Sequence, residues 1–152
     1  MKCAIYIRTG SKNNQAFQIK TQAEGLKHFI AEQNWELYDS YIDTSSGSNK
    51  YKKLQALIED AKNCKFDVIL ATDVSRLFRH LDSAIRLKEL CATKKIHIIT
   101  LDNSINTLHH DVDKIGLYAW MIDHESKIKS QIIKNGIRKA YLEKQNPILK
   151  TQ

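Results

Sequence analysis

Short apolar runs alternate with helical patterns along the first two thirds of the chain. Four runs have the composition of β-strands, and they span Cys3–Ile7, Glu36–Ile42, Phe66–Ala71 and Ile96–Leu101. The last two are almost entirely apolar, which is typical of strands covered on both faces. Between the runs, apolar residues recur at helical spacing near residues 16–33, 54–61 and 81–90. The alternation predicts an α/β fold with a mainly parallel sheet of four to five strands and helices on both faces.

The pattern changes after the fourth run, where a polar stretch leads into a long helical pattern without proline, from Asp111 to about residue 146. A helix of that length extends about 50 Å, farther than a domain of this size. Either it folds back as a hairpin at Gly136 or it packs against a partner subunit. We favour the partner, because apolar residues continue on both sides of the glycine. The expected homodimer contacts are Met121, Ile122, Ile128 and Ile132.

These patterns divide the chain into four parts. We expect an α/β domain over residues 1–102, a linker over 103–110, an oligomerisation helix over 111–146 and a tail over 147–152.

Composition adds constraints on location and partners. The 152 residues fit one domain, and no apolar run approaches the roughly 20 residues of a membrane span. Three separated cysteines indicate reduced thiols in a cytoplasmic protein. The net charge is +7, and residues 127–150 hold seven Lys or Arg residues against one acidic residue. This excess is compatible with a nucleic-acid partner.

Polar residues follow the predicted strands, whose carboxyl ends form the usual site edge of a parallel sheet. They are Arg8, Gly10 and Ser11 after the first strand, Asp43 and Ser46 after the second, and Ser75, Arg76 and Arg79 after the third. Because Arg76 and Arg79 are three residues apart, one helical turn would point them the same way. Guanidinium groups suit a phosphate-like oxyanion. The sequence contains no metal or nucleotide motif, so we expect no metal and no cofactor.

The role of Ser11 stays open on the residues alone. Along a strand, residues three apart point to opposite faces, so Arg8 and Ser11 diverge unless Gly10 bends the chain. Ser11 is therefore either a nucleophile beside Arg8 or the first residue of a loop.

A set of collinear segments resembles the catalytic domain of the serine recombinase family, which includes resolvases, invertases and large serine integrases. The segments are "AIYIR", "IKTQAEGL", "DTSSG", "LQALIEDAKNCKFDVIL", "SRLFRHLDSAIRLKELC", "IHIITLD" and "YAWMIDHESKIKSQIIKNGI". They cover nearly the whole chain, and their order and spacing carry the resemblance.

The resemblance implies metal-free, site-specific DNA recombination of the kind found in bacteria, phages and mobile elements. A serine would attack a DNA phosphodiester, giving a 5′-phosphoserine bond and a free 3′-hydroxyl. Its implied catalytic residues are Ser11, Arg8, Arg76 and Arg79, shaped by Tyr6, Gly10, Gln22, Asp43, Ser46 and Ser75. Its implied DNA contacts are Lys134, Arg138 and Lys139. The implied partners are double-stranded DNA and a second copy of the chain, with a tetramer in the synaptic complex.

Three departures from the family pattern support an alternative, a resolvase-like protein that dimerises and binds DNA without cutting it. Two residues, rather than one, separate Arg8 from Ser11, so glycine could hold the nucleophile position. Ser75 replaces an expected aspartate. An arginine expected before "LQAL" is missing, and the nearest residues are Lys50, Tyr51 and Lys52. A third interpretation, a phosphate- or nucleotide-binding protein unrelated to DNA, lacks the glycine-rich loop it would need.

Overall fold

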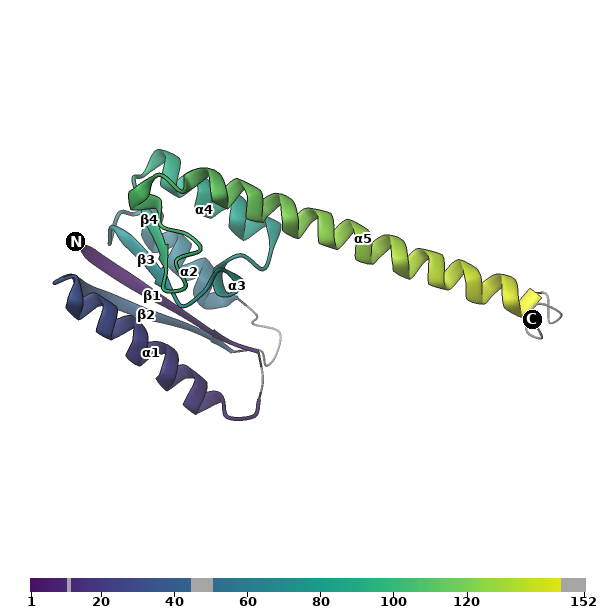
Figure 1. Cartoon of the computed structure of the whole chain (residues 1–152), viewed down its shortest axis with the longest axis horizontal. Helices are drawn as coiled ribbons and strands as arrows, with labels where there is room; N and C mark the ends of the chain where they lie inside the picture. Colours follow the sequence, from purple (N-terminus) through teal and green to yellow (C-terminus); the bar gives the residue numbers. More distant parts are fainter. Residues whose placement is uncertain (11, 45–50, 146–152) are drawn as a thin grey trace.

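Figure 1 shows an α/β domain from which one long helix projects. The computed structural model describes residues 1–10, 12–44 and 51–145. The strands are β1 (Lys2–Thr9), β2 (Glu36–Thr44), β3 (Val68–Ala71) and β4 (His97–Thr100). The helices are α1 (Gln15–Glu32), α2 (Lys52–Lys62), α3 (Val74–Leu77), α4 (Leu81–Thr93) and α5 (Val112–Gln145), with a 3-10 turn at Thr107–His109.

The described strands form a four-stranded sheet in the order β2-β1-β3-β4, and every neighbouring pair is parallel. This confirms the predicted α/β fold. β3 and β4 are shorter than their apolar runs, because Phe66 and Ile96 lie just before the strands and are buried there. An apolar run in the sequence indicates which residues are buried, and buried residues continue beyond the ends of the hydrogen-bonded strand.

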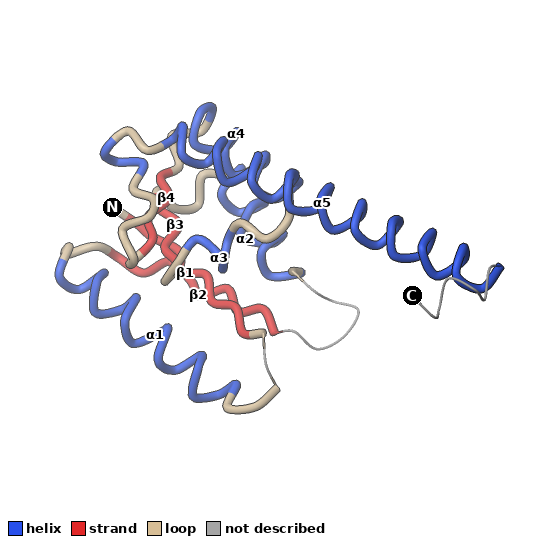
Figure 2. The backbone as a smooth tube through the Cα atoms, turned by 45° about the vertical axis from the view of Figure 1, so that its right-hand side comes forward, coloured by secondary structure: helices blue, strands red, loops and turns tan. Residues whose placement is uncertain are grey.

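The interior strand β1 separates two cores, because successive side chains of a strand point to opposite faces. Its apolar residues at odd positions join a cluster with Leu26 and Ile30 of α1. Its apolar residues at even positions join a cluster with Leu57 of α2 and Leu87 of α4. Helices therefore cover both faces of the sheet, with α1 alone on one side in Figure 2.

Helix α5 begins against the domain and ends far from it. Ile115 and Ala119 are buried, and the first turns of the helix pack along α4. From His124 onward nearly every residue is exposed, and Figure 1 shows this half extending past the domain. We call residues 124–145 the overhang; at 1.5 Å per residue it is about 30 Å long. The helix runs unbroken through Gly136, so the hairpin alternative is wrong.

The segment between β4 and α5 packs against the domain. Ile105 and Thr107 are buried, and Asn106 forms an isolated antiparallel bridge with Ile99. The amide of Ile98 donates to the Thr107 hydroxyl at 2.9 Å. None of the helices within the described ranges is both long enough and apolar enough to cross a membrane.

Candidate active site

A cleft of about 440 Å³ lies where β1 and β2 end. The residues that line it are Arg8, Thr9, Gly10, Lys12, Asp43, Thr44, Tyr51 and Arg79. The cleft thus combines residues from the ends of two strands, the start of α2 and the segment after α3.

Arg8 is the most deeply placed cation of the cleft, with 7% of its surface exposed. Its Nη2 donates to the Ser75 carbonyl at 3.0 Å, and its buried Nε has no hydrogen-bond partner among the described residues. Burial, followed by the charge of Arg79 and then that of Arg76, lowers the pKa of Arg8. Within the described chain no carboxylate forms an ion pair with Arg8. An anion that entered the cleft would meet a positive charge that no carboxylate in the described part of the chain neutralises.

Asp43 lies opposite Arg8 in the register of β1 and β2, yet its carboxylate makes its hydrogen bonds to other residues. It accepts from the Tyr6 hydroxyl at 2.9 Å and from the amides of Lys53 and Leu54 at 3.0 and 2.9 Å. These amides belong to the first turn of α2, which favours a negative charge. Burial, reinforced by the neighbouring Asp43, raises the pKa of Tyr6. Tyr6 and Asp43 therefore fix the floor of the cleft to α2.

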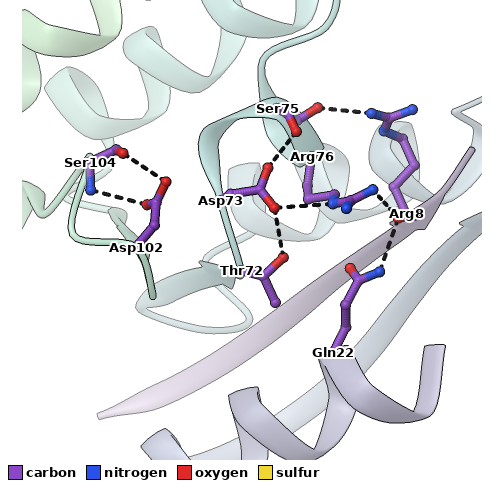
Figure 3. Close-up of polar contacts among 8 residues, drawn as sticks. All are labelled: Arg8, Gln22, Thr72, Asp73, Ser75, Arg76, Asp102 and Ser104. Carbon is purple, nitrogen blue, oxygen red and sulfur yellow. Dashed lines mark hydrogen bonds and ion pairs between the residues drawn. The ribbon is translucent and has the colours of Figure 1, made fainter. Parts of the chain in front are cut away.

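Residues 72–76 form a second hydrogen-bonded cluster behind Arg8 (Figure 3). Arg76 donates from Nη1 to the Arg8 carbonyl at 2.9 Å and from Nε to Asp73 at 3.2 Å. Asp73 also accepts from the hydroxyls of Thr72 and Ser75. Burial alone would raise the pKa of Asp73, but the Ser75 hydrogen bond and the Arg76 charge outweigh it and lower the pKa. The cluster holds the backbone of β1 where Arg8 enters the cleft.

The two arginines after β3 lie differently from the prediction of one shared helical turn. Helix α3 ends at Leu77, and Phe78 leaves the helical conformation to stack on Tyr118 of α5 at 6.0 Å. Arg79 is therefore beyond the helix, where it is exposed and lines the cleft. Arg76 does not line the cleft, because its guanidinium bonds to protein groups.

The remaining predicted residues divide into those that are described and those that are not. Gln22 is buried and donates to the Arg8 carbonyl at 3.2 Å (Figure 3), while its Oε1 has no partner among the described residues. Gly10 lines the cleft with φ outside the left-handed region and room for a Cβ, so its backbone angle does not require glycine. Ser11, Ser46 and Lys50 lie outside the described residues.

Sequence reasoning missed part of the cleft lining. The unnamed residues are Thr9, Lys12 and Thr44, and Tyr51 was considered only as a neighbour of a missing arginine. Thr9 and Thr44 are the last residues of their strands, so a stricter search of strand ends would have found them. Nothing in the local sequence around Tyr51 signals that it lines the cleft.

Figure 3 also draws a small turn after β4, in which the Asp102 carboxylate accepts from the Ser104 amide and hydroxyl at 3.0 and 2.7 Å. Neither residue lines the cleft. No group of metal-ligating side chains occurs among the described residues.

The predicted contacts on α5 are mostly exposed. Lys134, Arg138 and Lys139 lie on the overhang, as do Ile128 and Ile132. Met121 is 41% exposed. Ile122 instead packs against the domain's own core.

Comparisons with known proteins agree with this architecture. The family model "Resolvase, N terminal domain" matches residues 3–146. The N-terminal catalytic domain of TP901-1 integrase is 26% identical, with a TM-score of 0.63 over 87% of this chain and 98% of that one. A resolvase family site-specific recombinase from Streptococcus pneumoniae is 19% identical, with a TM-score of 0.72 over 93% and 99%.

The C-terminal catalytic domain of ISC1926 TnpA, an IS607-like serine recombinase, also shares the fold, with 19% identity and a TM-score of 0.59 over 93% and 99%. No match was found among curated protein sequences. The family match spans the sheet, the cleft and the whole of α5. The chain therefore belongs to the resolvase family of serine recombinases and corresponds to its catalytic domain.

Proposed function

We propose that this chain cuts and rejoins double-stranded DNA, with Ser11 as the nucleophile. Its hydroxyl oxygen attacks a phosphodiester phosphorus, a 5′-phosphoserine bond forms, and the 3′-oxygen leaves as a hydroxyl. The observation that carries the proposal is the buried, uncompensated Arg8 in a cleft that Arg79 also lines. The covalent neighbours of Ser11, Gly10 and Lys12, line the same cleft, which supports the choice of nucleophile.

The three arginines have different roles in this proposal, because they make different contacts. Arg8 and Arg79 face the cleft, where two guanidinium groups can stabilise the charge that builds on the phosphorus oxygens in the transition state. Arg76 acts as a positioning residue, since its hydrogen bond to the Arg8 carbonyl fixes the strand that carries Arg8. The same positive charges favour ionisation of a nearby serine hydroxyl, which is otherwise a weak nucleophile.

A DNA-binding protein without cleavage activity is the second candidate. The observation that favours it is that Arg76 makes its hydrogen bonds to Asp73 and the Arg8 carbonyl, leaving two of the three expected arginines at the cleft. Such a protein would keep the dimer and the DNA contacts and lack only the covalent step.

The deciding experiment incubates the protein with supercoiled DNA that carries its recombination site and looks for covalent protein–DNA adducts. We expect Ser11→Ala to abolish adducts without changing folding, and Ser11→Cys to retain some attack because a thiol is the better nucleophile. Ser126→Ala, at an exposed serine of α5, is the matched control and should form adducts normally.

Two results would go against the proposal. Adducts that persist on Ser11→Ala would remove the nucleophile assignment. Unmodified protein that binds the site but forms no adducts would favour the second candidate.

The basic overhang supplies the sequence-independent part of DNA binding in this proposal. Lys134, Arg138 and Lys139 are exposed there and can contact phosphates along the duplex. A homodimer through α5 would present two such overhangs to one DNA, and two dimers would form the synaptic tetramer.

A further inference from the structure

Tyr51 lines the cleft with Arg8 and Arg79 and has no role in the reaction proposed above. It directly precedes α2, and its carbonyl accepts from the Gln55 amide at 3.0 Å. The residue therefore begins the helix whose first turn Asp43 also holds.

Two contacts hold Tyr51 in place. His80 meets it edge-on, with ring centroids 4.3 Å apart and planes at 80°. Tyr51 is also partly buried and packs against the core cluster that contains Leu57 of α2 and Leu87 of α4. His80 directly follows Arg79, so the contact joins the start of α2 to the segment that brings Arg79 to the cleft.

The backbone of Tyr51 has a left-handed conformation with φ 67° and ψ 16°. A bulky residue in that region is strained by roughly 1–3 kcal/mol and persists only when its surroundings hold it there. Asparagine or glycine would fit the backbone with less strain. The strained residue is also one that lines the cleft, and this points to a use for its side chain.

The phenol hydroxyl is available for a ligand. Among the described residues it has no hydrogen-bond partner, although Arg8 is near enough for Tyr51 to influence its guanidinium. A phenol donates one hydrogen bond and adds no positive charge beside the two arginines. The Tyr51 hydroxyl thus adds a neutral donor to a cleft whose cations are Arg8, Lys12 and Arg79.

We propose that the Tyr51 hydroxyl donates a hydrogen bond to an oxygen of the phosphodiester bound between Arg8 and Arg79. The inference rests on the proposed function and adds to it a third phosphate-binding group, contributed by α2. His80 keeps the phenol ring upright in the cleft, so the hydroxyl is oriented before the substrate arrives.

Binding of orthovanadate, an inorganic phosphate mimic, tests the inference by titration calorimetry on the whole chain. Tyr51→Phe removes only the hydroxyl and keeps the ring, and it should weaken binding roughly 10- to 100-fold, the range for one hydrogen bond to a charged acceptor. Tyr38→Phe is the matched control, because Tyr38 also makes a ring contact, with Phe66, but does not line the cleft. It should bind like unmodified protein.

Adduct formation on supercoiled DNA, measured with the same variants, separates this inference from the proposed function. Equal orthovanadate binding by Tyr51→Phe and unmodified protein would overturn the role of Tyr51, even if DNA adducts form normally. Weaker binding by Tyr51→Phe with no adducts from any variant would leave Tyr51 as an anion-binding residue and refute the cleavage reaction. Unmodified protein that fails to bind orthovanadate would overturn the inference outright.

Discussion

Asp43 is the single side chain on which the cleft depends most for its shape. It is 5% exposed and accepts three hydrogen bonds, from the Tyr6 hydroxyl and two amides of α2. Removing its carboxylate leaves three donors without a partner in a buried place.

We expect Asp43→Ala to lower the free energy of unfolding by roughly 2–4 kcal/mol, since it removes a helix cap and leaves buried donors unsatisfied. Urea unfolding followed by circular dichroism measures the change. Asp39→Ala on the same strand is the control; Asp39 is exposed, so its removal should change stability by no more than about 0.5 kcal/mol. Equal effects of the two variants would contradict the structural role of Asp43.

At this scale the sequence predicts residue types well and their orientation poorly. Arg8, Asp43 and Arg79 reach one cleft because the ends of parallel strands share an edge, a rule that needs only the order of the elements. The different fates of Arg76 and Arg79 depend on Phe78, which leaves the helix to stack on a residue forty positions away. No local pattern encodes a contact of that kind.

Among the elements, α5 carries an apolar face that the domain covers only in part. Ile133 and Ile137 lie 18 residues after Ile115 and Ala119, which is five turns of helix, so the two pairs share a face. Ile115 and Ala119 are 0% and 8% exposed, whereas Ile133 and Ile137 are 61% and 65% exposed. Ile128 and Ile132 add a second exposed apolar row. Contiguous apolar surface of this extent is uncommon on a monomer.

We expect the chain to form a two-fold homodimer through α5 at micromolar concentration, because a self-complementary contact buries such a face against its own copy. Ile128→Ala combined with Ile132→Ala should shift the population toward monomer, each truncation costing roughly 2–5 kcal/mol if its site is buried in the dimer. Sedimentation velocity measures the shift. Phe17→Ala serves as control. Phe17 is also apolar and is 71% exposed, but it lies in the first turn of α1 and not on α5. A monomeric unmodified protein with an intact helix would contradict this expectation.

The spacing of apolar residues predicts which strands and helices form, but it does not predict where they begin and end. The four strands and the four longer helices of the described ranges appear where the apolar spacing predicts them. The short α3 was not predicted, because four residues are too few to show a helical period. Residues 103–110 look like a linker by polarity, yet the burial of Ile105 and Thr107 depends on a bridge to β4 that composition does not reveal.

Over the whole molecule, positive charge is unevenly distributed. The net charge is +7, and the overhang contributes a large part of it through exposed lysines and Arg138. A duplex approaching the molecule would therefore be attracted first to α5.

Replacing Lys134, Arg138 and Lys139 with glutamine should weaken DNA binding regardless of sequence and flatten its salt dependence. The slope of log K against log salt should fall by about 0.9 for each phosphate that the variant no longer neutralises. Fluorescence anisotropy with a labelled duplex at several salt concentrations measures it.

A matched variant replaces Lys20, Lys27 and Lys94 with glutamine and changes the net charge by the same amount elsewhere on the surface. Its slope should stay close to that of the unmodified protein. If both variants have the same slope, net charge alone governs binding and the overhang has no special part.

The exposure of the overhang also affects how rigid its backbone is before and after binding. The domain supports α5 only as far as about His124, and a helix without tertiary packing lacks the contacts that give helices in proteins most of their stability. In the lone chain its last turns should fray and re-form on the submicrosecond timescale of helix–coil exchange. A dimer partner or a duplex then arrests this motion, and the entropic cost offsets part of the favourable binding energy. Ordering the overhang lowers the affinity for the partner subunit and for the duplex alike. Whichever of them binds first orders the helix, so the second binds without that entropic cost. Dimerisation and DNA binding are then cooperative even without a contact between the partner subunit and the duplex.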